Sequence, residues 1–359
     1  MPDKAYLVLE NGAVFEGYGF GAQGEAVGET VFTTGMTGYL ETLTDKSYYG
    51  QLVTQTFPLI GNYGVIPEDF ESGVIAAKGY IVRQWCQDPS NFRSEGELDA
   101  FLRSRGVVGL YGIDTRRLTK QLRESGVMNG MITPRKPEGV PAAVKNFVIR
   151  DSVKSCSTDT EYTVNPGGNV KIALLDYGLK ENIIRELARR GCAVTVLPHN
   201  TPAERVRALR PDGIMLSNGP GDPRDAENAR IVENLKLLVE YKIPIFGICF
   251  GNQLLALAHG FAIEKLKYGH RGANQPARDL TTGRTYITSQ NHGYAVVSAS
   301  IDARLGTEWF NNVNDGTNEG VLYKNSPVSS VQFHPEACSG PRDASWLFDR
   351  FMAQMKEVR

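Results

Sequence analysis

Cysteine is scarce in this chain, which has five in 359 residues. They stand at Cys86, Cys156, Cys192, Cys249 and Cys338. An odd number of cysteines without a C-x-x-C pair argues against a disulfide framework and against a zinc site. We therefore expect a protein of a reducing compartment, the cytoplasm, that holds no metal of its own.

The chain also has no excess of positive or negative charge and no long apolar run. The 39 Lys and Arg residues nearly cancel the 40 Asp and Glu residues, which gives no electrostatic case for binding nucleic acid or an anionic membrane. No apolar run approaches the ~20 residues of a transmembrane helix, and the N-terminus resembles neither a signal peptide nor a transit peptide. The chain also lacks a P-loop motif.

Residues 1–150 are rich in short β-strand patterns and in turn-forming glycine. Residues 3–20 alternate around Asn11-Gly12, as in a β-hairpin. Another strand pattern lies within 71–87, residues 95–105 look like an amphipathic helix, and a second helix is predicted to end at Gly126. This part of the chain therefore predicts a smaller, β-rich α+β domain.

The pattern changes after a polar segment that ends in Pro and Gly, and we take residues 151–169 as a linker. From residue 170 onward, strand and helix patterns alternate. Strands are predicted at 171–178, 193–200 and 212–223, and helices at 182–191 and 227–242. Alternation of this kind predicts a mostly parallel α/β domain over 170–359, with helices on both faces of the sheet and ligands at the carboxyl ends of the strands. After about residue 270 the strand patterns follow one another more closely.

The most informative stretch is 243–257, IPIFGICFGNQLLAL. It is typical of a strand, a tight turn and a helix, with Gly247 and Gly251 on either side of Cys249. Such glycines suit a sharp corner like the one that presents a nucleophilic serine at the carboxyl edge of a parallel sheet. The helix dipole would favour a thiolate there, although a single cysteine in an apolar stretch is more often a small buried hydrophobic residue.

Two further stretches follow predicted strands. The loop 217–223, SNGPGDP, has glycines that would let backbone N–H groups approach a ligand, although an ordinary turn is the plainer interpretation. In QFHPE, Glu336 follows His334 by two residues in an extended segment, which puts both side chains on one side. Glu336 could then orient the ring of His334, and the ring could take the proton of a cysteine thiol.

In this order and spacing, SNGPGDP, GICFGNQ and QFHPEA resemble the class I (triad) glutamine amidotransferases. In the first half of the chain, GETVFTTGMTGYLETLTDKSYYGQ, FPLIGNYG, SNFR, GIDTRRLT and GVMNG resemble the small, glutamine-hydrolysing subunits of carbamoyl phosphate synthetases. The resemblance covers nearly the whole chain, with residues 133–165 its least characteristic part.

The resemblance implies roles by position. Cys249 would be the nucleophile, His334 the general base and then acid, and Glu336 the acid that orients His334. The backbone N–H groups of Phe250 and Gly221 would form an oxyanion hole. Further contacts with glutamine would come from Ser47, Gly219, Gln253, Asn291, Gly293 and Tyr294. Ser47 belongs to the first domain, and without the resemblance a turn or cap residue would be the simpler interpretation.

The resemblance also implies a partner. Ammonia released from L-glutamine would pass to a separate large subunit, which uses bicarbonate and ATP with Mg²⁺ to make carbamoyl phosphate for arginine and pyrimidine synthesis. The first domain would contact that subunit in a heterodimer or higher heteromer. This chain itself would need no cofactor.

One position departs from the family's pattern G-x-C-x-G-H-Q, because Asn252 stands where the histidine is usual. We interpret this as variation at a supporting position, since Cys249 is present. One alternative is the glutaminase of another amidotransferase, such as anthranilate synthase, against which the extra first domain counts. The other is a catalytically silent structural subunit, which Asn252 favours and the intact Cys249, His334 and Glu336 oppose.

Overall fold

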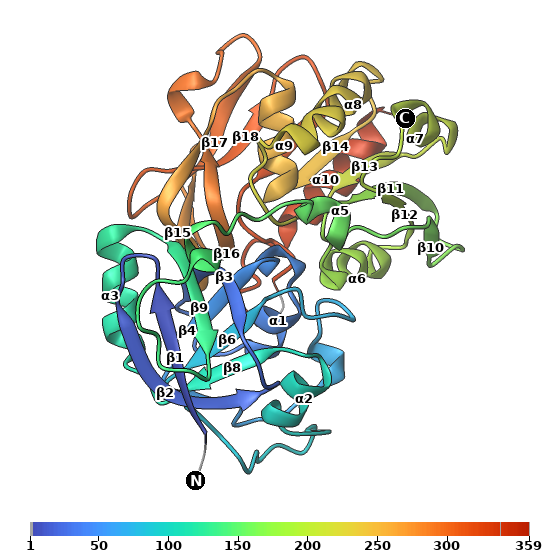
Figure 1. The fold of residues 1–359 in the computed structure, drawn as a ribbon. Helices are drawn as coiled ribbons and strands as arrows, with labels where there is room; N and C mark the ends of the chain where they lie inside the picture. Colours follow the sequence, from blue (N-terminus) through green and yellow to red (C-terminus); the bar gives the residue numbers. More distant parts are fainter. Residues whose placement is uncertain (1–2, 338, 359) are drawn as a thin grey trace. The chain divides into compact units, whose positions relative to one another are not determined.

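The computed structural model describes residues 3–337 and 339–358, so Cys338 lies outside the described residues. The chain divides into two compact units, Met1–Ser152 and Val153–Arg359 (Figure 1). The division falls close to the end that was expected for the first domain, at residue 150. Each unit has its own apolar core and is described by itself.

The first unit is built around a closed β-barrel with the strand order β1-β2-β8-β6-β4-β3-β9. Its strands are β1 Lys4–Leu9, β2 Val14–Gly21, β3 Ala26–Thr33, β4 Gln51–Gln55, β6 Gly79–Val82, β8 Val108–Tyr111 and β9 Met128–Thr133. Closure pairs the outer strands with each other, so the barrel has no free edge. The β-rich character expected for this part of the chain is confirmed.

Short helices and strands surround the barrel. They are α1 Tyr39–Thr44, α2 Leu98–Ser104, α3 Thr115–Ser125, α4 Ala142–Lys145, the 3₁₀ helices η1 Lys46–Tyr48 and η2 Pro67–Asp69, and the paired strands β5 Leu59–Ile60 and β7 Gln84–Trp85. The helix α3 begins after Asp114, whose carboxylate accepts a hydrogen bond from the Arg117 N–H, and it stops at Gly126 as predicted.

The predicted hairpin is formed by β1 and β2. The two strands pair antiparallel from Lys4 opposite Tyr18 to Val8 opposite Val14. Gly12 in the turn has φ +86°, a left-handed conformation that glycine adopts without a steric penalty. The Asn-Gly signal therefore identified both the turn and the two strands that it joins.

Most of the expected linker is part of the second unit. Residues 151–169 contain helix α5 Ser152–Cys156 and strand β10 Tyr162–Val164. Strand β10 pairs antiparallel with β12 Cys192–Pro198, and Val153 is buried in the core of the second unit. The expected linker was wrong because a single edge strand and one short helix need few apolar residues, so their polar composition resembles that of a linker.

The second unit contains a ten-stranded sheet in the order β10-β12-β11-β13-β14-β19-β18-β17-β15-β16. The strands not yet given are β11 Val170–Asp176, β13 Gly213–Leu216, β14 Ile245–Ile248, β15 Ile263–Asp279, β16 Thr285–Val296, β17 Gly306–Asn312, β18 Asn318–Tyr323 and β19 Val328–Val331. The consecutive strands β12, β11, β13, β14 and β19 are parallel, as predicted. The strand β10 and the strands beyond β19 pair antiparallel.

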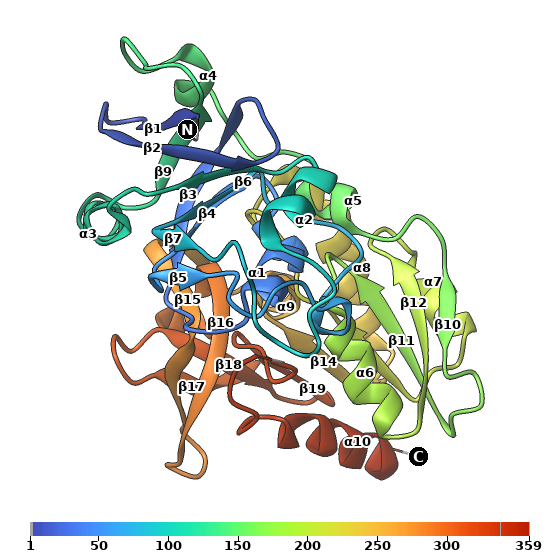
Figure 2. The ribbon, with the colours of Figure 1, turned by 90° about the horizontal axis from the view of Figure 1, so that it is seen from below.

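Helices cover both faces of the parallel strands. Along β11, Ile172 belongs to one apolar core and its neighbour Ala173 to the other, because successive strand residues point to opposite faces. One core is closed by α6 Glu181–Arg189 and α10 Trp346–Val358, which lie beside each other in Figure 2. The other is closed by α7 Ala203–Ala208, α8 Ala229–Glu240 and α9 Phe250–Ala258. The predicted α/β class with covered faces is confirmed.

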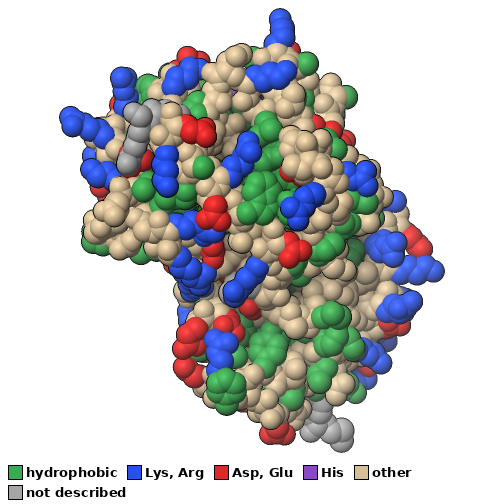
Figure 3. Space-filling model, turned by 180° about the vertical axis from the view of Figure 1, so that it is seen from behind, with side chains coloured by type: hydrophobic (Ala, Val, Ile, Leu, Met, Phe, Trp, Pro, Cys, Tyr) green, Lys and Arg blue, Asp and Glu red, His purple; other side chains and the backbone are tan. Residues whose placement is uncertain are grey.

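The surface agrees with the balanced composition of the chain. On the face shown in Figure 3, basic and acidic side chains are interspersed. Among the described residues, no helix is both long enough and apolar enough to cross a membrane.

Candidate active site

The turn between β14 and α9 holds Cys249 in a conformation that is rare for a residue with a side chain. Cys249 has φ +53° and ψ −100°, and Phe250 begins the helix directly after it. A Cβ on Gly247 would lie 2.9 Å from the Gly251 carbonyl oxygen, and a Cβ on Gly251 would lie 2.6 Å from the Leu216 carbonyl oxygen. Both glycines are therefore required by close packing, which explains the G-x-C-x-G spacing. Strain of this kind costs about 1–3 kcal/mol and is concentrated at functional sites.

Cys249 is held from two sides at the carboxyl end of β14. Its backbone N–H donates to the Val331 carbonyl of the neighbouring strand β19 at 2.8 Å. Its Sγ lies 3.8 Å from the Asn291 carbonyl oxygen of β16, and the residue is only 2% exposed. The thiol is therefore fixed between the end of the parallel strands and the antiparallel part of the sheet.

His334 and Glu336 form a buried pair next to this cysteine. The Nδ1 of His334 lies 2.6 Å from Glu336 Oε1, and both residues are 1% exposed. Their segment follows β19, and the His334 N–H donates to the Ser289 carbonyl at 2.9 Å. With Nδ1 occupied by Glu336, the other nitrogen, Nε2, has no hydrogen bond of ordinary length among the described residues. It is the nitrogen available for proton exchange.

The electrostatics of the pair favour a positive imidazole. Burial and the nearby Lys180 would each lower the pKa of His334, but the Glu336 carboxylate and the Cys249 thiol outweigh them and raise it. Burial would raise the pKa of Glu336, yet His334 holds that pKa below its usual value. His334 is therefore a stronger base than a free histidine, and its imidazolium form is stabilised once a proton arrives.

Two polar residues after β11, which the sequence analysis missed, also reach this pair. Asn182 donates through its side-chain amide to the backbone carbonyl of Glu336. Lys180 is only 8% exposed, and its charge acts on the pKa of both His334 and Glu336. Their position just after the carboxyl end of a parallel strand was the signal that could have identified them.

The loop after β13 is fixed by its own polar side chains. Ser217 Oγ accepts a hydrogen bond from the Tyr177 N–H at 2.9 Å, and the Ser217 carbonyl accepts one from Gly251 at 3.1 Å. A Cβ at Gly219 would lie 2.5 Å from the Tyr177 carbonyl oxygen, and Gly221 has φ +91°. Both predicted loop glycines thus occupy positions that other residues would not fit.

Three of the predicted glutamine contacts lie on β16 and one lies on α9. Asn291, Gly293 and Tyr294 belong to β16, and the Asn291 carbonyl faces the thiol of Cys249. The side-chain amide of Gln253 donates to the Tyr294 carbonyl at 2.9 Å. The structure therefore brings this group and Cys249 to one place within the second unit. Ser47 lies in η1 of the first unit, where its N–H donates to Asp45, and its contact with glutamine remains a prediction.

Asn252 is fully buried and takes part in a hydrogen-bonded network beneath the turn. Its Oδ1 accepts from Ser330 Oγ at 2.7 Å, and its Nδ2 donates to Gln332 Oε1 at 3.1 Å. Gln253 Nε2 donates to the same Gln332 oxygen at 3.1 Å. The Asn252 amide thus satisfies both partners, and its supporting role in the site stays a prediction.

Known proteins match the chain along nearly all of its length. Residues 7–132 match the family model of the carbamoyl-phosphate synthase small chain, CPSase domain, and residues 173–354 match class-I glutamine amidotransferases. A carbamoyl phosphate synthase small chain of Clostridium perfringens is 52% identical over 97% of this chain and 99% of its own length. One of Bacillus caldolyticus is 48% identical over 99% of this chain and 97% of its own. The match with a solved glutamine amidotransferase of Thermotoga maritima covers 53% of this chain and 85% of that protein, at 19% identity and with a TM-score of 0.37.

Proposed function

Because the chain belongs to the family of carbamoyl-phosphate synthase small chains, with a class-I glutamine amidotransferase domain, we propose that it hydrolyses glutamine through Cys249, His334 and Glu336. One observation carries the proposal. A buried histidine–carboxylate pair interacts with a cysteine that is fixed in a strained turn between strand and helix. This is the arrangement of nucleophile, base and orienting group used in covalent catalysis.

In the first half of the reaction, the sulfur of Cys249 bonds to the side-chain amide carbon of glutamine while His334 Nε2 takes the thiol proton. The amide oxygen becomes an oxyanion. His334 then returns the proton to the amide nitrogen, the carbon–nitrogen bond breaks, and ammonia leaves a thioester on Cys249. In the second half, water gives a proton to His334 and attacks the thioester, which releases glutamate and restores the thiol.

Two backbone groups are suited to stabilise the oxyanion. Phe250 is the first residue of α9, and the first N–H groups of a helix have no partners within it. The φ of +91° at Gly221 turns the loop after β13 in a way that is costly for other residues. Losing one donor of an oxyanion hole typically costs ~10²–10³-fold in kcat.

The ammonia has to be used by another chain. The relatives are named as small chains of a synthase, and we propose that this chain pairs with a large subunit in a cytoplasmic heterodimer or higher heteromer. That subunit would use bicarbonate and ATP with Mg²⁺ to make carbamoyl phosphate for arginine and pyrimidine synthesis. In this division of labour the first domain contacts the large subunit and supplies Ser47 to the glutamine site.

The experiment that tests the function concerns Asn252, the feature in favour of a silent subunit. We expect the native complex to release glutamate from glutamine in the presence of bicarbonate and ATP. Asn252→His should change kcat by less than about tenfold, roughly 1.4 kcal/mol, because histidine can also bond Ser330 and Gln332. If the native complex is inactive and the substitution activates it, the chain is a silenced subunit and the proposal is wrong.

A second substitution tests the contribution of the first unit. Ser47→Ala should raise the KM for glutamine by about 2–10-fold, since one hydrogen bond to a ligand is worth ~0.5–1.5 kcal/mol. The matched control is Ser104→Ala, because Ser104 is an exposed serine in the same unit whose hydroxyl donates to the Phe101 carbonyl of its own helix. Equal KM values for the Ser47 variant, the control and the native complex would remove Ser47 from the site.

A further inference from the structure

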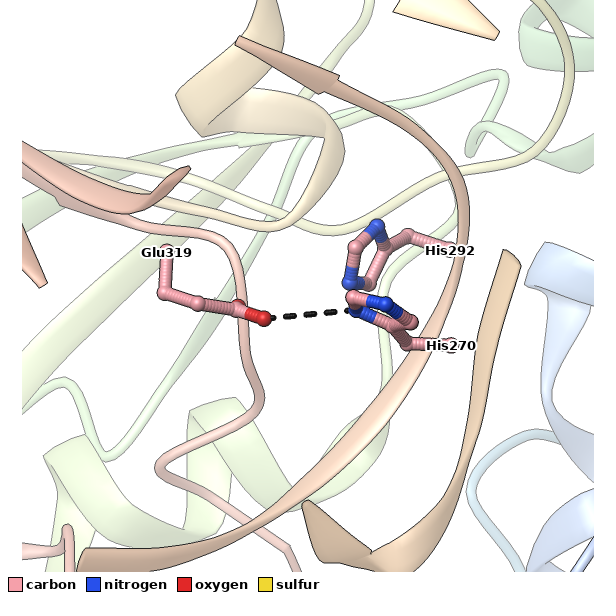
Figure 4. A group of neighbouring side chains, drawn as sticks. All are labelled: His270, His292 and Glu319. Atoms are coloured by element: carbon pink, nitrogen blue, oxygen red, sulfur yellow. Dashed lines mark ion pairs between the residues drawn. The ribbon is translucent and has the colours of Figure 1, made fainter. Parts of the chain in front are cut away.

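Three buried side chains with metal-binding atoms converge in the antiparallel part of the second unit. His270 on β15 lies directly opposite His292 on β16, and Glu319 reaches them from β18 (Figure 4). One possible ligand atom from each lies within 4.8 Å of the other two. The His270 Nδ1 and Glu319 Oε1 are 3.4 Å apart. Two ligands on a tetrahedral ion with bonds of ~2.1 Å are separated by about the same distance.

The outer nitrogen of each histidine is anchored, which leaves the inner nitrogen facing the others. His270 Nε2 lies 2.8 Å from the Asp315 carboxylate, and His292 Nδ1 lies 2.8 Å from the Tyr294 carbonyl oxygen. Metal-binding histidines almost always donate their second N–H to a carboxylate or a backbone carbonyl in this way. The inner atoms are then His270 Nδ1 and His292 Nε2.

Proton donors supply only part of the inner side of the cluster: Asn312 Nδ2 lies 3.4 Å from His270 Nδ1 and 3.0 Å from Glu319 Oε1. A neutral His292 has one N–H, which the Tyr294 carbonyl takes, so the lone pair of Nε2 faces the oxygen of Gln290 at 3.2 Å. Thr288 fixes the orientation of the Gln290 amide. The Thr288 hydroxyl donates its proton to the Gln275 carbonyl at 2.8 Å, so it can only accept from Gln290, whose amide nitrogen donates to it at 3.1 Å. Two lone pairs that point at each other repel, and a cation bound between them would attract both.

Glu319 also has an acceptor atom that no proton donor reaches among the described residues. It is fully buried, and its Oε2 has no hydrogen-bond partner among the described residues, although Asn312 donates to Oε1 at 3.0 Å. A buried carboxylate oxygen without a partner is costly. A divalent cation would pair with it, and Asp315 behind His270 would balance the second charge.

We propose that His270 Nδ1, His292 Nε2 and the Glu319 carboxylate bind a divalent cation of the zinc class, with Gln290 Oε1 as a fourth ligand. Two imidazole nitrogens with carboxylate and carbonyl oxygens suit Zn²⁺ in a tetrahedral site. The sequence carried no signal for it, because the ligands stand far apart in the chain on three different strands. The absence of a C-x-x-C pair excludes only a site made of cysteine ligands, so this site would correct the expectation of no zinc.

Such an ion would stabilise strand β16, whose Asn291 carbonyl faces the Cys249 thiol. His292 lies between Asn291 and Gly293 on β16, so an ion on its ring ties that strand to β15 and β18. This consequence for glutamine binding depends on the proposed function, whereas binding of the ion itself does not.

The test is a calorimetric titration of Zn²⁺ into the metal-stripped full chain carrying Cys249→Ser. That background removes a thiol that could bind zinc together with His334 and makes the result independent of glutaminase activity. We expect one equivalent to bind. Adding Glu319→Gln, which keeps the shape of the side chain, should weaken binding by at least ~10²-fold, and Asp315→Asn by ~10–100-fold through the orientation of His270.

The matched control is His199→Gln, a histidine of the second unit outside the cluster, which should leave the affinity unchanged. Circular dichroism on each variant checks that the fold is retained, and a Co²⁺-substituted chain gives an independent readout, since its visible spectrum should be lost with Glu319→Gln. The proposal is overturned if the Cys249→Ser chain binds no zinc, or if Glu319→Gln and Asp315→Asn both bind it with the parent's affinity. Either result would make the cluster a hydrogen-bonded network alone.

Discussion

Replacing Cys249 by serine should abolish glutamine-dependent carbamoyl phosphate synthesis and leave the ammonia-dependent reaction of the complex intact. The sulfur is the atom that bonds to the substrate, and a hydroxyl has a far higher pKa than a thiol. Loss of a nucleophile costs ~10³-fold or more. Serine matches cysteine in size, so the strained turn and its neighbours should be retained. The measurement compares carbamoyl phosphate formed from glutamine with that formed from ammonium salt by the same reconstituted complex.

A suitable control for this experiment is Cys86→Ser, in the first unit, where the thiol donates to the backbone carbonyl of Asp88. It should leave both reactions unchanged. If Cys249→Ser lowers the glutamine and ammonia reactions equally, then Cys249 maintains the structure of the complex and does not carry the chemistry.

His334→Asn should lower the kcat for glutamate release by at least ~10²-fold, within the ~10²–10⁴-fold range of general acid–base assistance. An asparagine amide has no basic nitrogen at working pH, so it can neither take the thiol proton nor protonate the leaving nitrogen. The raised pKa of His334, which Glu336 and Cys249 cause against the effects of burial and Lys180, makes the native residue a strong acceptor. The effect should appear in kcat more than in KM, because the ring acts on the reacting atoms.

His199→Asn serves as the control, since His199 is half-buried elsewhere in the second unit and its Nδ1 has no partner among the described residues. A fall in kcat of less than tenfold for His334→Asn, with the fold intact, would assign the proton transfer to another group. Glu336→Gln should then be compared, because it removes only the residue that orients the ring.

The parts of the molecule that were predicted well carry local signals. Asn11-Gly12 marks a hairpin because few residues accept a left-handed turn, and Gly247 and Gly251 mark a corner because a Cβ at either would collide with backbone or side-chain atoms. Alternation of strand and helix over 170–258 has the same local character. In each case a short segment is enough to fix the conformation.

The parts that were missed depend on contacts between distant segments. Strand β10 was taken for a linker because only its pairing with β12 makes it a strand. Lys180 and Asn182 reach His334 and Glu336 only after β11 and β19 come into one sheet. The cluster of His270, His292 and Glu319 likewise exists only once β15, β16 and β18 are assembled. The periodicity of a single segment could not indicate contacts between residues on distant strands.

The pairing of β10 with β12 also determines where the glutaminase unit can be cut from the rest of the chain. A fragment that begins at residue 170, as the composition suggests, would leave out β10 and expose the N–H and C=O groups along β12. Strand β12 is apolar, and an unpaired apolar edge is a template for pairing with another copy. A fragment that begins at Val153 retains both the edge strand and the buried Val153 side chain. The two fragments differ by the seventeen residues 153–169. For recombinant production, we expect the fragment that contains them to have a paired edge strand and the shorter fragment to aggregate.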